Sequence, residues 1–218
     1  YIDHVNKNKL FGVYSINDDL INFKKNKELS KKLNQLIKKH DLIIVSDYGH
    51  GFISKKNAEL ICKKAKFSSL NAQINAANIG YQTMKNYSSL DCVIINENEL
   101  RHEMRDRSTN LSKLMKSLSS RQLIDNLIVT RGQSGSIMFN KKENKFYQCD
   151  AFATKVIDKV GAGDTMLSLI SIMLRANINK NLALFSASLA AANSVESQGN
   201  SESIKKINIL KSIEHLLK

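Results

Sequence analysis

The stretch Asp158-Lys-Val-Gly161-Ala162-Gly163-Asp164 leads directly into an apolar segment, Thr165-Met-Leu-Ser-Leu-Ile170. Two glycines around an alanine let the backbone pass close to a ligand while a helix begins, and the first-turn amides of a helix attract anions. A carboxylate beside an anion site needs an explanation. The position of Asp164 is explained if its carboxylate takes a proton from a hydroxyl while the amides hold the phosphoryl group that this hydroxyl attacks. The alternative is a glycine turn in which Asp164 only caps the helix.

Strand-like and helix-like segments alternate before this stretch, and helices follow it. Short apolar runs predict strands over residues 11–16, 41–46, 67–72, 91–95, 126–130, 135–139 and 145–149, the last two joined as a hairpin through 141–144. Helical patterns cover residues 27–39, 55–66 after an N-cap at Ser54, 76–85, 97–104, 111–119, 164–176, 182–197 and 204–217. This alternation predicts an α/β fold, with a mostly parallel sheet covered by helices on both faces and ligands at the carboxyl ends of the strands.

Composition narrows the class of protein. The 218 residues carry a formal charge of +13, but only six of the 33 basic residues are Arg, and the lysines are scattered rather than mixed with aromatics. This pattern favours a bias in overall amino-acid composition as the source of the charge, rather than a nucleic-acid site.

We expect no membrane association, since no apolar run is long enough to span a bilayer. The three separated cysteines indicate no disulfide framework and a cytoplasmic location. Residues 1–218 read as a single domain, and its start at Tyr1 rather than Met predicts that it is N-terminally incomplete.

A second polar feature is Asn96-Glu-Asn-Glu99, which directly follows the apolar run 92–95. Amide and carboxylate oxygens at the carboxyl end of a strand can hold hydrated Mg²⁺ near phosphates, because Mg²⁺ takes few protein ligands and keeps its water. The alternative is an acidic helix start that complements the helix dipole.

A third is Thr130-Arg-Gly132-Gln-Ser-Gly135, where one expected strand ends and another begins. The Thr130 hydroxyl and exposed amides are suited to line a nucleotide site, and the alternative is a tight turn that needs positive φ.

Taken in their order along the chain (96–99, 130–135, 158–164), these three segments resemble the ribokinase-like carbohydrate kinases, also called the phosphofructokinase-B type. The family's Asp-Thr-x-Gly-Ala-Gly-Asp is similar to 158–164, its Asn-x-x-Glu to Asn96 and Glu99, and its Thr-x-Gly-x-x-Gly to Thr130, Gly132 and Gly135. The resemblance covers about residues 41–199. It implies a three-layer ribokinase-like sandwich whose N-terminal strands and sugar-binding lid are missing or partial here.

The resemblance also implies roles for residues. Asp164 would be the base, and the amides of Gly161, Ala162 and Gly163 would stabilise the transferring phosphoryl group. Asn96 and Glu99 would organise Mg²⁺ through water. The nucleotide ATP would be bordered by Asn96, Glu99, Thr130, Gly132, Gly135 and Asn193. Asp47, Tyr48 and Asp164 would contact the sugar, although Tyr48 packing within its own loop is the alternative.

Within the family, Val45-Ser-Asp-Tyr-Gly-His-Gly51 is similar to the Ser-Asp-Tyr-Gly-Lys-Gly of heptose-phosphate kinases, which are often fused to a nucleotidyltransferase. That subgroup would act on a heptose phosphate for lipopolysaccharide or capsule precursors. Departures are His50 for Lys, Lys159 for Thr, and Asn71-Ala-Gln73 where an Asp-Pro-Lys is expected; the last removes a phosphate-contacting Lys.

Two main hypotheses follow. The first is an ATP-dependent kinase of a sugar or sugar phosphate, acting as a homodimer or fused to a nucleotidyltransferase module. The second is a catalytically degenerate kinase-like domain that binds nucleotide or supports such a transferase. Retention of Asp164 favours activity, and the altered segment 71–73 argues against it.

Overall fold

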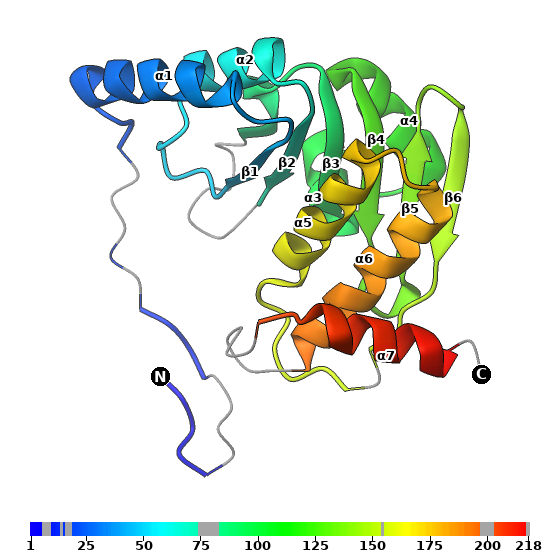
Figure 1. Ribbon diagram of the computed structural model, residues 1–218. Helices are drawn as coiled ribbons and strands as arrows, with labels where there is room; N and C mark the ends of the chain where they lie inside the picture. The colour runs from blue at the N-terminus through cyan, green and yellow to red at the C-terminus, as the bar shows by residue number, and fades with distance from the viewer. Residues whose placement is uncertain are drawn as a thin grey trace.

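The computed structural model describes residues 1–5, 10–13, 15, 19–73, 83–153, 155–196 and 203–216 (Figure 1). Its centre is a six-stranded sheet in which the strands follow one another in sequence order. The strands are β1 (Ile43–Asp47), β2 (Ser68–Ala72), β3 (Leu90–Asn96), β4 (Ile124–Thr130), β5 (Ser136–Asn140) and β6 (Lys145–Cys149). β1 to β4 are parallel, and β5 and β6 continue the sheet as an antiparallel hairpin. The predicted α/β fold with a mostly parallel sheet is confirmed.

Seven α-helices form in the described residues. They are α1 (Phe23–Ile37), α2 (Lys55–Lys64), α3 (Glu97–Met104), α4 (Leu111–Gln122), α5 (Ala162–Arg175), α6 (Lys180–Val195) and α7 (Lys206–Leu216). Polar side chains start several of them as the sequence indicates. Ser54, for example, is the N-cap of α2 and accepts a hydrogen bond from the Asn57 amide.

Helices cover both faces of the sheet and make three layers (Figure 1). The buried strands alternate between two cores because successive side chains point to opposite faces. Val93 and Ile95 belong to the core under α1 to α4, whereas Cys92 and Ile94 belong to the core under α5 and α6. α5 contributes Met166, Leu167, Ile170 and Leu174 to the second core. Each such side chain stabilises the fold by about 1.5–3 kcal/mol on burial, which anchors the helix that carries Asp164.

The predicted strand over residues 11–16 is wrong for the part that the structure describes. Residues 11–13 and 15 are not in a strand, and the side chain of Val13 is 77% exposed. A strand is stable only when a neighbouring backbone takes up its hydrogen bonds, and the described sheet offers these residues no neighbour. The apolar pattern alone carried no information about that partner.

The predicted helix over residues 76–85 lies largely outside the described residues. Its last part forms a short 3₁₀ turn, Thr83–Asn86, which leads to β3. The other predicted helices and strands are present with ends shifted by a few residues, and the 141–144 hairpin turn joins β5 to β6.

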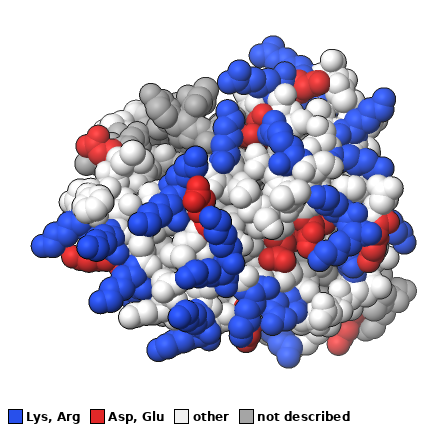
Figure 2. Space-filling model, turned by 90° about the horizontal axis from the view of Figure 1, so that it is seen from above, with Lys and Arg blue, Asp and Glu red and all other residues white. Residues whose placement is uncertain are grey.

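Basic side chains cover much of the face seen from above, with acidic side chains between them (Figure 2). α1 and α2 alone carry nine lysines and two glutamates, so more than half of the formal charge of +13 lies on these two helices. Among the described residues, no helix combines the length and apolarity that a membrane crossing needs.

Candidate active site

The glycine turn before α5 places a helix start over the carboxyl edge of the sheet. Gly161 is the N-cap and has φ +86°, in the left-handed region that favours glycine. The Thr165 amide makes the first helical hydrogen bond, to the Gly161 carbonyl. The amides of Ala162, Gly163 and Asp164 precede that bond, so no carbonyl of the helix satisfies them. The helix start therefore leaves these three amides available to an anion, and Asp164 lies within the first turn.

Asp164 is held by side chains from the ends of two strands. Ser46 Oγ, on β1, donates a hydrogen bond to Asp164 Oδ1 over 2.7 Å, and Asn71 Nδ2, on β2, lies 3.5 Å from the same oxygen. Tyr48, in the loop after β1, donates its hydroxyl to Asp164 Oδ2 over 3.2 Å. The carboxylate is thus oriented by three donors rather than serving only as a helix cap.

The register of the sheet explains this convergence. Ser46, Asn71, Ile94 and Ile128 are partners in one row across β1 to β4. Residues of one row face the same side of a sheet, and Ile94 and Ile128 lie in the core under α5 and α6. The row is therefore apolar under the body of the helices and becomes polar where α5 presents Asp164.

The next row on that face also consists of polar side chains. Asn96 pairs with Thr130, which pairs with Ser136 across the end of β4. Ser136 Oγ lies 2.9 Å from Ser188 Oγ on α6, which ties this edge to the helix layer. Two of the three sequence segments, those around Asn96 and Thr130, therefore lie side by side, and the glycine turn lies over the neighbouring strands β1 and β2.

Asn96 and Glu99 form a capping box at the start of α3. Asn96 Oδ1 accepts from the Glu99 amide over 2.8 Å, and Glu99 Oε2 accepts from the Asn96 amide over 2.9 Å. The helix-start interpretation of this segment is realised in the structure. Its proposed role toward magnesium stays a prediction.

The turn after β4 requires glycine at one position. Gly135 has φ +75°, and a Cβ there would lie 2.1 Å from the Cys149 carbonyl oxygen. Gly132 has φ +56° with open space around it, and Thr130 is half-buried at the strand end. The tight-turn interpretation is therefore also realised, and the predicted contact of these residues with a nucleotide stays untested.

Asn193 lies on α6, half-buried, near the loop that leads to the glycine turn. The carbonyl of Val195, two residues later, accepts hydrogen bonds from the amides of Ile157 and Asp158. The end of α6 thus fixes the loop that begins the 158–164 segment. Lys159, in that loop, is exposed.

Asp47 is oriented away from Asp164. Its side chain is only 5% exposed, and its carboxylate accepts from the Tyr87 hydroxyl over 2.8 Å and from the Gly49 amide over 3.0 Å. Tyr48, by contrast, is 44% exposed and contacts Asp164. Of the two residues predicted beside the sugar, the structure brings Tyr48 to the base and holds Asp47 inside the protein.

An acidic residue that sequence reasoning missed lies beside the capping box. Glu97 pairs with Arg101 over 2.8 Å and with Arg131, which directly follows Thr130, over 3.3 Å. Burial raises the pKa of the Glu97 carboxyl, but hydrogen bonds and charge from the two arginines outweigh it and lower this pKa below its ordinary value. Glu97 therefore joins the ends of β3 and β4 across the predicted nucleotide edge.

The comparison with known sequences decides the family. Residues 13–207 match the family described as pfkB family carbohydrate kinase. The chain belongs to the pfkB family of carbohydrate kinases.

Relatives and structures of this pfkB-family chain agree with that membership. It is 28% identical over 185 residues to the bifunctional protein HldE of Aliarcobacter butzleri, and 27% identical over 198 residues to that of Helicobacter pylori strain HPAG1. These matches cover 83% and 87% of this chain but only 37% and 42% of the relatives. The chain thus spans less than half the length of these two relatives.

The fold is that of ribokinase-like proteins. Phosphofructokinase-2 from Escherichia coli, in complex with potassium, superposes with a TM-score of 0.74 at 14% identity, over 91% of this chain and 64% of that one. Ribokinase from Arabidopsis thaliana, complexed with ribose and ATP, gives 0.66 at 16% identity, over 88% and 59%. The three-layer sandwich predicted from the motifs is confirmed.

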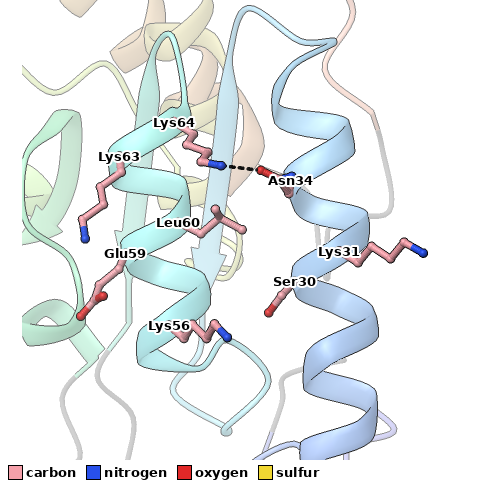
Figure 3. Close-up of a pocket in the computed structure, with 8 residues that line it drawn as sticks. All are labelled: Ser30, Lys31, Asn34, Lys56, Glu59, Leu60, Lys63 and Lys64. Carbon is pink, nitrogen blue, oxygen red and sulfur yellow. Dashed lines mark hydrogen bonds between the residues drawn. The ribbon is translucent and has the colours of Figure 1, made fainter.

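A surface pocket lies elsewhere on this pfkB-family chain. It has a volume of about 370 Å³, lies between α1 and α2, and is lined by Ser30, Lys31, Asn34, Lys56, Glu59, Leu60, Lys63 and Lys64 (Figure 3). Lys64 Nζ donates to Asn34 Oδ1 over 2.8 Å. Because α2 and α5 pack against opposite faces of the sheet, this pocket is not part of the site around Asp164.

Three further residues in or beside the site, besides Glu97, were not singled out from the sequence as functional. Ser46 lies inside the segment that resembles heptose-phosphate kinases, so its place two residues before Tyr48 was the available signal. Asn71 was noted only as a departure from the family. Tyr87 had no local signal, because its importance depends on a contact with Asp47, 40 residues away.

Proposed function

We propose that this protein transfers the γ-phosphoryl group of ATP to a hydroxyl of a sugar or sugar phosphate. The observation that carries the proposal is the orientation of Asp164, which three donors hold at the first turn of α5. Membership of the pfkB family of carbohydrate kinases supports the same reaction class.

In the proposed reaction, Asp164 accepts the proton of the sugar hydroxyl. The hydroxyl oxygen forms a bond to the γ-phosphorus as the bond from that phosphorus to the leaving oxygen breaks, and ADP departs with the electron pair. The amides of Gly161, Ala162 and Gly163 donate to the phosphoryl oxygens as charge develops on them. Positioning and charge stabilisation thus supply the rate.

The three donors to Asp164 have separate roles in this proposal. Ser46 and Asn71 act on Oδ1 and fix the plane of the carboxylate. Tyr48 acts on Oδ2, is exposed and makes the longer of the two hydroxyl contacts. The sugar hydroxyl therefore approaches Oδ2, with Tyr48 giving way or bonding to the sugar.

The nucleotide would lie along the carboxyl edge beyond β2. Neighbouring strands are about 4.8 Å apart, so the ends of β3 and β4 lie roughly one and two strand spacings from Asn71. This span suits a chain of phosphates that begins at α5 and passes Asn96 and Glu99. Thr130, Gly132, Gly135 and Asn193 would border the rest of the nucleotide.

Magnesium fits the oxygen-donor side chains at this edge. The described ranges contain no group of three or more His, Cys, Asp or Glu placed so that it could hold a metal ion, but Mg²⁺ needs few protein ligands when phosphates and water complete its shell. Asn96 and Glu99 would hold it through water. When bound, Mg²⁺ neutralises phosphate charge.

The finer part of the proposal is a heptose phosphate as acceptor. The relatives named bifunctional protein HldE and the segment 45–51 support this choice. A fused or associated nucleotidyltransferase module, or a second copy of the chain, would then be the partner. We place the reaction in the cytoplasm, where ATP and three free thiols are compatible.

The test is ADP release by the full-length gene product with Mg²⁺ and ATP across a panel of sugars and sugar phosphates that includes heptose 7-phosphate. ADP release that depends on one sugar supports the kinase and identifies its acceptor. ATP binding without turnover on any sugar contradicts it and favours a degenerate nucleotide-binding domain, which the altered segment 71–73 would explain.

A further inference from the structure

A buried hydrogen bond lies directly behind the loop that carries Tyr48. The Tyr87 side chain is fully buried, and its hydroxyl donates to Asp47 Oδ2 over 2.8 Å. Asp47 Oδ1 accepts from the Gly49 amide, and the Asp47 carbonyl accepts from the Gln73 amide over 3.1 Å. Asp47 is therefore fixed through its side chain and its backbone.

Asp47 lies between two residues that contact Asp164. Its two neighbours, Ser46 and Tyr48, are the residues that donate to Asp164. Successive side chains of a strand point to opposite faces, so Asp47 faces the core under α1 to α4 while Ser46 faces α5. Tyr48, in the loop that follows, contacts Asp164 as well. A contact on one side of the sheet is thus adjacent in the chain to two contacts on the other side.

The hydrogen bond between Tyr87 and Asp47 is expected to be stable. A buried carboxylate is costly unless hydrogen bonds satisfy it, and Tyr87 supplies one of its two side-chain bonds. Burial and the nearby Asp47 charge raise the pKa of Tyr87, so its hydroxyl stays protonated and remains a donor. The pair does not reach Asp164 itself, so any effect on the reaction passes through Ser46 and Tyr48.

We propose that Tyr87 and Asp47 are a positioning pair, which holds the end of β1 so that Ser46 and Tyr48 meet Asp164. This inference rests on the proposed function for its effect on turnover. The effect of the pair on the order of residues 46–51 does not depend on the proposed function. Both residues are positioning residues, since neither contacts the reacting groups.

The main test is Tyr87→Phe in the full-length protein, which removes only the hydroxyl. We expect kcat to fall about 10- to 100-fold, the KM for ATP to change less than twofold, and amide hydrogen exchange in residues 46–51 to become faster. Tyr147→Phe is the matched control. Tyr147 lies on the edge strand β6, and its hydroxyl donates to Glu143 in the turn between β5 and β6. Removing this hydroxyl should leave kcat and the exchange in residues 46–51 unchanged.

A second pair of variants keeps the test decisive if Tyr87→Phe does not fold. Asp47→Asn retains an acceptor oxygen for one partner, and its amide can donate to the Tyr87 hydroxyl. We expect its kcat to fall by less than about threefold. Asp47→Ala removes both contacts and should reproduce the loss and the faster loop exchange of Tyr87→Phe.

The outcomes separate the two ideas. A Tyr87→Phe protein with normal kcat and normal loop exchange, but a lower melting temperature, would overturn the positioning pair and leave Tyr87 a purely structural residue. Equal losses in Asp47→Asn and Asp47→Ala would overturn it as well. If the wild-type protein phosphorylates no sugar, the proposed function fails, and exchange in residues 46–51 alone decides whether the pair fixes the loop.

Discussion

Ser46 donates its hydroxyl to Asp164 Oδ1 over 2.7 Å, although 118 positions separate the two residues in the chain. The contact joins the end of β1 to the first turn of α5. Asn71 lies 3.5 Å from the same oxygen, so residues of two strands act on one side of the carboxylate. Its other oxygen, Oδ2, is left to Tyr48 and to the proposed substrate.

Ser46→Ala is expected to lower kcat about tenfold, because the carboxylate loses its shortest orienting contact and rotates away from the hydroxyl it must meet. The KM for ATP should change less than twofold, since Ser46 lies away from the proposed nucleotide edge. ADP release under saturating acceptor measures both. Ser117→Ala, on the exposed face of α4, is the control and should match wild type. An unchanged kcat for Ser46→Ala would remove Ser46 from the site.

Asp164→Asn is expected to lower kcat by ~10²–10⁴-fold, because an amide cannot accept the proton of the acceptor hydroxyl. ATP affinity, measured by calorimetry, should stay within about twofold, since the side chain keeps its size and its place at the helix start. Asp125→Asn provides the matched control, because Asp125 pairs with Lys142 near the amino end of β4. Turnover in Asp164→Asn close to that of the control would contradict the assigned base.

The sequence predicted those features that depend on local chemistry. The alternation of apolar runs gave the sheet and its helices, and the Gly-Ala-Gly segment gave the start of α5. What it missed depends on contacts far along the chain. Residues 11–13 have an apolar pattern but no described neighbouring strand, and Tyr87 gains its importance only from Asp47.

The burial of Asp47 could have been predicted in part from the alternation of side chains along a strand. A carboxylate at the end of a strand in a ligand-binding sheet resembles a substrate contact. Yet Ser46 and Asp47 are adjacent in one strand, so they cannot face the same side. Once Ser46 is known to meet Asp164, Asp47 must face the other core, where its burial is observed.

Gly135→Ala is expected to destabilise the fold by roughly 2–3 kcal/mol. Its φ of +75° disfavours any Cβ, and the added atom would lie 2.1 Å from the backbone oxygen of Cys149. Gly132→Ala is the control, since its φ of +56° carries a left-handed penalty of about 1–2 kcal/mol without a clash. Urea unfolding measures the difference. Equal losses in the two variants would show that the contact with Cys149 relaxes freely.

Asn96→Ala separates the capping role of Asn96 from its proposed role toward magnesium. Loss of the cap should cost about 1 kcal/mol in urea unfolding, and loss of the metal contact should raise the Mg²⁺ concentration needed for half-maximal ADP release. Asn110→Ala removes the N-cap of α4, whose side chain accepts from the Ser112 amide, and should cost similar stability without changing the Mg²⁺ requirement. An unaltered Mg²⁺ requirement in Asn96→Ala would limit this residue to capping.

Glu97→Gln is expected to make the free energy of unfolding depend less on pH in the acidic range. The folded-state pKa of Glu97 lies below its ordinary value of 4.5, because Arg101 and Arg131 favour the charged form more than burial disfavours it. A carboxyl group with a lowered pKa stabilises the fold above its unfolded pKa, and this stabilisation is lost as the pH falls through the folded pKa. The variant should therefore be about 1 kcal/mol less stable than wild type at pH 7, and the difference should shrink as the pH falls below 4.5.

Urea unfolding at pH 7, 5, 4 and 3.5 measures this difference, with Glu28→Gln on the exposed face of α1 as the control. A difference that stays constant over this range would mean that the two arginines do not act on the Glu97 charge.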